Sequence, residues 1–207
     1  MLESLIGVLN PRKKGSDWPA LVESIRAGAA YLGQGISYSY LRARTLLAGP
    51  KLFSDADFGF ALTICKWEAF GVAAQDLILM IEADHRDGLN PDPARRASVL
   101  LELYKDVLAS EPVPEHRQDK GWSDLVAAFE TRLESYMNKP PLGPDGISIA
   151  TAMAVLDNAP IESAVRDADQ MMVVNNTAFR FIEYQAKMRK ALDIPAIMAE
   201  LDARMSA

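Results

Sequence analysis

Apolar residues recur through most of this chain at alternating steps of three and four positions. That spacing places side chains on one face of an α-helix, which completes a turn in about 3.6 residues. The strict alternation of apolar and polar residues that marks a half-buried strand does not extend over any useful length. The pattern therefore predicts an all-α fold.

The three longest periodic stretches determine the predicted architecture. The first begins near Ser16 or Asp17 and the second at Ser54 or Asp55, all residue types that accept hydrogen bonds at a helix start. The third covers residues 160–192. Each is expected to have about 30 residues, against a usual helix length of about 11–12. Long antiparallel helices joined by short loops pack as a bundle, and the shorter periodic stretches bring the predicted total to about six or seven helices.

Prolines and glycines divide the chain into parts. Residues 1–15 combine an amphipathic tail with a basic turn, residues 16–138 form the bundle core, and residues 147–207 form C-terminal helices. The linker before the C-terminal helices, residues 139–146, reads KPPLGPDG, and its prolines and glycines interrupt helices. We expect the C-terminal helices to pack on the same core, so that the chain is one domain.

Net charge and cysteine content narrow the possible functions. A net charge of −6 repels phosphate backbones, so no nucleic-acid partner is expected. Cys65 is the sole cysteine, which fits a reducing compartment and predicts a cytoplasmic protein with an inert core thiol. Lys66, Glu68 and Asp76 interrupt the most apolar stretch, so no membrane span is predicted. Weak docking of residues 1–9 on a membrane surface is left open.

One polar stripe stands out on the second long helix. With a rotation of about 100° per residue, one narrow face collects Glu68, Gly71, Gln75, Glu82 and Arg86. The first interpretation is that this stripe faces water. The second is an internal polar cleft with Glu68 and Glu82 as acids or ligands, in which Glu68 and Gln75 would contact a bound molecule. The third is an internal ion-pair network with Arg42 or Arg44.

Glu82 and His85 form a Glu-x-x-His pair, a spacing that puts both side chains on one helix face, as in di-iron carboxylate bundles. A complete di-iron site needs a second such motif, and nothing similar surrounds His116, the other histidine. A single-metal site using Glu82, His85 and a carboxylate from another helix remains an alternative. The simpler interpretation is that His85 complements the dipole at its helix C-terminus. No cofactor is predicted.

Two asparagines, Asn175 and Asn176, lie in the middle of the third long helix, although asparagine is a poor helix former. An apolar seam passes through the first of them and comprises Val165, Ala168, Met172, Asn175, Phe179, Ile182 and Ala186. The favoured interpretation is a buried hydrogen bond that fixes register or oligomeric state. A ligand contact by Asn175 or Asn176 is the alternative. The adjacent stripe, with Asp169, Asn176 and Glu183, is expected to be solvated.

The sequence contains no constellation that identifies a reaction. The long apolar seams and the methionines of the C-terminal third favour a non-catalytic protein that binds another protein, as an adaptor, assembly factor or dedicated chaperone, or itself as a homodimer. A small-ligand-dependent or metal-dependent enzyme, with a polar site on the helix at residues 55–87, is the first alternative. A hydrophobic-ligand carrier, with Trp67 and Phe70 facing a cavity, is the second.

Overall fold

The computed structural model describes residues 14–45 and 50–207, and the regular structure of this part of the chain is helical. The predicted all-α bundle is confirmed, while the predicted tail at residues 1–9 lies outside the described residues. The α-helices are α2 (Trp18–Arg44), α3 (Pro50–Phe53), α4 (Ala56–His85), α5 (Pro93–Ala109), α6 (Ser123–Met137), α7 (Pro144–Ile147), α8 (Ile149–Asn158), α9 (Ser163–Ala191) and α10 (Ile194–Ser206). Two 3-10 turns, η1 (Arg86–Gly88) and η2 (Glu115–Arg117), lie between them.

Three of these helices are long, as predicted: α2, α4 and α9 have 27, 30 and 29 residues. The side chains of Asp17 and Asp55 accept hydrogen bonds from the backbone N–H groups of Ala20 and Phe58, so these predicted N-caps are confirmed. The predicted shorter helices correspond to α5, α6, α8 and α10. The sequence did not reveal α3 and α7, because a helix of one turn produces no periodic pattern.

Helices α2 and α4 run antiparallel and come unusually close where α2 carries glycines. A Cβ atom on Gly33 would lie only 2.7 Å from the backbone nitrogen of Phe70, so no side chain fits between the two backbones. Earlier in α2, a Cβ atom on Gly28 would lie 2.8 Å from the side chain of Leu77. Increasing residue numbers on α2 therefore meet decreasing numbers on α4, and the contact at Gly33 fixes how these helices pack.

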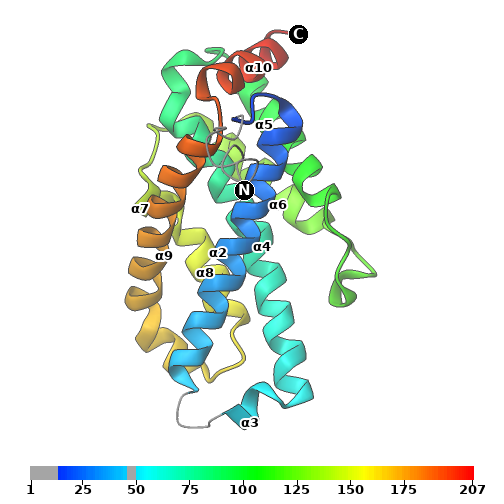
Figure 1. The fold of residues 1–207 in the computed structure, drawn as a ribbon, viewed down its shortest axis with the longest axis vertical. Coiled ribbons are helices and arrows are strands. Elements are labelled where there is room, and N and C mark those ends of the chain that lie inside the picture. The colour runs from blue at the N-terminus through cyan, green and yellow to red at the C-terminus, as the bar shows by residue number, and fades with distance from the viewer. Residues whose placement is uncertain (1–13, 46–49) are drawn as a thin grey trace, which may run out of the picture.

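Helix α4 lies within the bundle, whereas α9 lies along its edge, on the left in Figure 1. Contacts with α2, α5, α6, α7 and α8 surround α4, and every residue from 73 to 82 is buried. Helix α9 packs on α2, α7 and α8. One hydrophobic cluster runs from Trp18 to Met205 and includes residues of all three long helices. These positions decide which faces of α4 and α9 are in contact with water.

Contacts near both ends fix α9 against α2. Near the N-terminus of α9, Asp169 forms an ion pair with Arg44. Near its C-terminus, the hydroxyl of Tyr184 donates a 2.9 Å hydrogen bond to the carbonyl oxygen of Ser24, and its ring lies against Gly28. The two helices are therefore antiparallel, and Arg180 adds a 3.0 Å hydrogen bond to Ser39 between these two points.

Candidate functional site

The polar stripe of α4 is buried. Glu82 and Gln75 are 0% and 4% exposed, and the side chain of Glu68 is 17% exposed. The interpretation that this stripe faces water is therefore wrong, because α5, α6 and the turn η2 pack over it. An internal polar network is present instead, but its arginines are not the expected Arg42 and Arg44.

Glu68 is paired with Arg117, whose side chain is 1% exposed. Arg117 donates from Nε to Glu68 Oε1 at 2.7 Å and from Nη2 to Oε2, and His116 Nε2 lies 2.8 Å from Oε1. Burial alone raises the pKa of Glu68, but the hydrogen bonds from Arg117 and His116 outweigh it and lower the pKa below its ordinary value. The carboxylate is therefore held in its ionised form.

Arg117 was missed at the sequence level, because the polar, proline-containing segment at residues 110–120 resembles a solvated loop. The turn η2 directs this side chain inward, where Nη1 donates a 2.7 Å hydrogen bond to Asp124 Oδ1. Burial raises the pKa of Asp124, but hydrogen bonds from Lys120 and Arg117 lower it to about 2. The loop thus provides the central cation of a buried network.

Gln75 and Asp76 form a second polar cluster. Gln75 Nε2 donates to the hydroxyl of Tyr104 at 3.1 Å and to a backbone carbonyl of α6 at 3.2 Å. Asp76 is fully buried, accepts hydrogen bonds from the backbone N–H and the hydroxyl of Thr151, and lies 2.6 Å from Arg132 Nη2. Burial raises the pKa of Asp76. The amide predicted to contact a ligand therefore joins α4 to α5 and α6.

Glu82 and His85 do not converge on a common point. Both oxygens of Glu82 accept 2.8 Å hydrogen bonds from Arg86, and Arg96 Nε lies 3.3 Å from Oε1. His85 instead lines a polar depression at the C-terminal end of α4, together with Asp84. Among residues 14–45 and 50–207, no three His, Cys, Asp or Glu side chains are grouped so that they could hold a metal ion.

The aromatic side chains of α4 that were predicted to face a ligand cavity pack against other protein groups. The ring centroids of Trp67 and Phe70 lie 5.5 Å apart, and both contact Trp122, at 6.1 and 6.3 Å. The guanidinium carbon of Arg117 lies 5.1 Å from the centroid of the Trp122 ring. Cys65 is also buried, and burial raises the pKa of its thiol to about 11, as expected for an inert core thiol.

The apolar seam of α9 is exposed. We define the α9 outer face as Val165, Ala168, Met171, Met172, Asn175, Phe179, Ile182 and Ala186, all of them exposed residues. The most exposed large side chains among them are Met171, at 68%, and Phe179, at 64%. Asn175 is exposed in the single chain, so the buried hydrogen bond of the favoured interpretation does not form within it.

The rotation of the helix explains this arrangement. Residues two positions apart differ in direction by about 200° on an α-helix. Phe179 therefore points outward while Phe181, which is 0% exposed, points into the core. Met171 and Val173 form a second such pair, in which Met171 is exposed and Val173 is buried. Helix α9 consequently carries two apolar faces, and the rest of the described chain covers only one of them.

The stripe beside the outer face also differs from expectation at one position. Asp169 is buried, where it accepts hydrogen bonds from Arg44 Nε at 2.5 Å and from the Tyr40 hydroxyl at 3.1 Å. Asn176 and Glu183 are exposed, as predicted. The ion pair accounts for the difference, because a buried carboxylate requires a charged or hydrogen-bonding partner.

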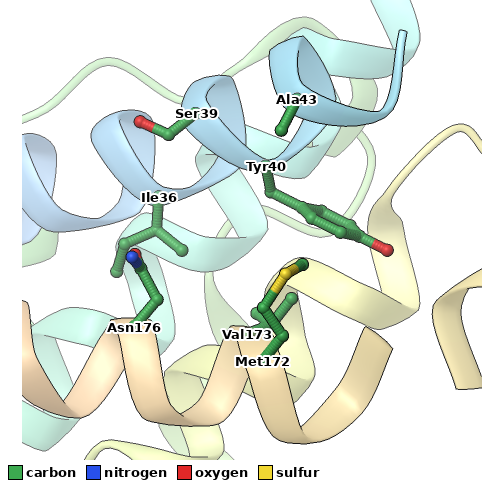
Figure 2. A pocket seen from close by; sticks show the side chains of 7 residues that line it. All are labelled: Ile36, Ser39, Tyr40, Ala43, Met172, Val173 and Asn176. Carbon is green, nitrogen blue, oxygen red and sulfur yellow. The ribbon is translucent and has the colours of Figure 1, made fainter. Parts of the chain in front are cut away.

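A small cavity of about 120 Å³ lies between α2 and α9. In Figure 2, Asn176, Met172 and Val173 project from α9 toward α2, and Ile36 and Tyr40 project toward α9. Cavities that bind drug-sized molecules measure about 300–1,000 Å³. This volume suits one protruding side chain better than a metabolite, although Asn176 was predicted to contact a ligand.

Comparisons with known proteins do not assign the chain to a family. The chain matches no family model, no curated protein sequence and no solved structure. In the part of the chain that the structure describes, no helix combines the length and the apolar character needed to cross a membrane. The inference of function therefore depends on the surface chemistry of the fold itself.

Proposed function

We propose that this protein is a non-catalytic helical protein that binds a protein partner, either a different chain or a second copy of itself, through the α9 outer face. One observation carries the proposal: this face exposes large apolar side chains directly opposite the buried face of the same helix. Contiguous exposed apolar surface of this kind marks interaction sites, because water contact with it is unfavourable. A sole cysteine cannot form a disulfide within the chain, which suits a reducing compartment, and we propose that binding takes place in the cytoplasm.

The polar clusters of α4 support the same proposal, because their side chains are already hydrogen-bonded within the protein and are not available to a ligand. The carboxylates of Glu68 and Glu82 accept hydrogen bonds from arginines, and Gln75 donates to protein atoms. A ligand at any of these groups would have to displace an existing hydrogen bond in a region that water hardly reaches. Binding at the α9 outer face requires no such displacement, so this face is the simpler site of interaction to propose.

Photo-crosslinking in cells tests this proposal. A photoreactive phenylalanine analogue replaces Phe179 or Met172 in the full chain, and control variants carry it at Glu130 or Glu134, which are exposed on α6. We expect discrete protein adducts from the two α9 positions and only background from α6. Mass spectrometry identifies the captured chain. Equal labelling from both helices, or none from α9, would remove the basis of the proposal.

A further inference from the structure

We propose that the partner of the α9 outer face is a second copy of this chain, bound through antiparallel pairing of the two α9 helices about a two-fold axis near Asn175. This inference rests on the proposed function and specifies its partner. It follows from the spacing, charge and polarity of residues on one helix face.

The spacing of the outer face suits a symmetric interface. Its apolar residues continue in both directions from Asn175 at steps of three and four, from Val165 to Ala186. An interface between identical copies uses one surface patch twice, so this patch must complement itself when reversed. Antiparallel pairing near Asn175 sets Ala168 opposite Ile182, a small side chain against a large one. The stretch is about 32 Å long, at about 1.5 Å per residue.

Charge at the two ends of α9 selects the antiparallel orientation. Exposed acids lie at the N-terminal end, at Glu162 and Asp167, and exposed bases lie at the C-terminal end, at Lys187 and Lys190. Antiparallel pairing brings the acidic end of one copy to the basic end of the other, whereas parallel pairing opposes like charges. Glu183 is an exposed acid within the basic end, and Arg166 is a partly buried base within the acidic end that donates to backbone carbonyls of α8; neither reverses this distribution.

The absence of charge on the outer face itself is also required for self-association. Each chain carries a net charge of −6, so two copies repel one another at long range. None of the eight side chains that define the α9 outer face is charged. The contact can therefore form without bringing further negative charge together, and the complementary ends offset part of the repulsion.

Asn175 acquires a role in this arrangement. Its side chain is exposed within an apolar stripe, and the described part of the chain provides it with no hydrogen bond. An asparagine amide both donates and accepts, so two copies that meet at a two-fold axis can satisfy each other. A single polar residue in an apolar helix seam favours the register that pairs it, at some cost in stability. Here that register is the symmetric one.

The cavity between α2 and α9 lies beside the proposed contact. Met172 belongs to both the outer face and the lining of this cavity. In the antiparallel pair, Met172 of one copy lies opposite Phe179 of the other. A cavity of about 120 Å³ next to this point leaves room for a protruding aromatic side chain. Apolar side chains that insert into such pockets dominate the binding energy of many interfaces.

The test measures the association of the full chain by sedimentation or light scattering over a range of concentrations. We expect the wild-type protein to reach twice the chain mass. Single variants Met172→Glu and Phe179→Lys should weaken dimerisation by at least about 100-fold, because each buries an unpaired charge in the contact. Both positions are exposed in the single chain, so these variants should fold, as circular dichroism would verify. Glu134→Lys on α6 is the matched surface control.

The double variant determines the orientation. With antiparallel pairing, Glu at position 172 of each copy faces Lys at position 179 of the other, so Met172→Glu combined with Phe179→Lys should dimerise within about tenfold of the wild type. Parallel pairing would instead set like charges together. Disruption by the single variants without recovery in the double variant would overturn the antiparallel arrangement.

Other occupants of the face give distinct results. A full-length chain that stays monomeric at about 100 µM overturns the second-copy assignment, since that concentration corresponds to about −5.5 kcal/mol of binding free energy. If crosslinks from position 179 then capture a different protein, the proposed function survives and this inference fails. Crosslinks to residues 1–13 of the same chain would assign the face to that segment, which contradicts both. The absence of any crosslink from α9 also contradicts both.

Discussion

Helices α4 and α9 are nearly equal in length, but α4 has buried polar side chains whereas α9 has exposed apolar ones. Helix α4 buries the polar side chains of its central part, and each buried acid there is paired with an arginine: Arg117 pairs with Glu68, Arg132 with Asp76 and Arg86 with Glu82. Helix α9 exposes apolar side chains such as Phe179. The position of each helix in the bundle, surrounded or at the edge, produces this difference.

The comparison of α4 with α9 shows that two properties of a helix face are independent: which side chains form it and whether it is buried. Periodicity identifies which side chains share a face of a helix, but it does not say what covers that face. On α4, polar groups are covered because neighbours surround the helix, and arginines make that burial tolerable. On α9, the apolar outer face has no covering helix in the described chain, and the proposed interaction surface rests on that exposure.

The largest expected effect compares two phenylalanines on α9. Replacing Phe181 with alanine should lower the free energy of unfolding by about 4 kcal/mol, because a core ring is removed and a cavity remains. Replacing Phe179 should change it by less than about 0.5 kcal/mol when the chain is monomeric. Urea denaturation at low protein concentration measures both. Equal losses would mean that the outer face is covered within the single chain.

The second effect compares two glutamates. Changing Glu82 to alanine should lower the free energy of unfolding by about 3 kcal/mol, because Arg96, which is itself buried, loses its counter-charge. Changing Glu183, exposed on α9, should cost less than about 0.5 kcal/mol. Thermal and chemical denaturation of both variants provide the measurement. A Glu82 variant as stable as the wild type would show that α4 does not depend on its buried ion pairs.

The smallest effect concerns acid. The folded state lowers the pKa of Glu68 and of Asp124. Their contribution to stability is therefore complete at a pH above the pKa of the unfolded chain. It is lost as the pH falls through the lower pKa of the folded protein. Asp124 is partly exposed, which limits its share to about 1 kcal/mol between about pH 5 and pH 2. In Asp124→Asn, stability should be lower at neutral pH and should fall less steeply in acid. An unchanged pH slope would contradict the assignment.

The sequence alone was sufficient for much of the fold. Capping residues such as Asp17 and Asp55 and the long periodic stretches located the long helices, because these signals are local. The pairing of Glu68 with Arg117 was not accessible, since 49 residues separate them and polar loop residues rarely reveal burial. The neighbours of Asn175 were identified correctly, but their exposure depends on where α9 lies in the bundle.

The contacts that fix α9 near both of its ends also affect how a partner would bind. Because the Asp169–Arg44 ion pair and the Tyr184–Ser24 hydrogen bond already hold the helix in place, docking requires no folding step. The entropy lost on binding is then limited to side chains and rigid-body motion. The heat-capacity change of association should scale with the apolar surface covered, without the larger contribution that accompanies coupled folding.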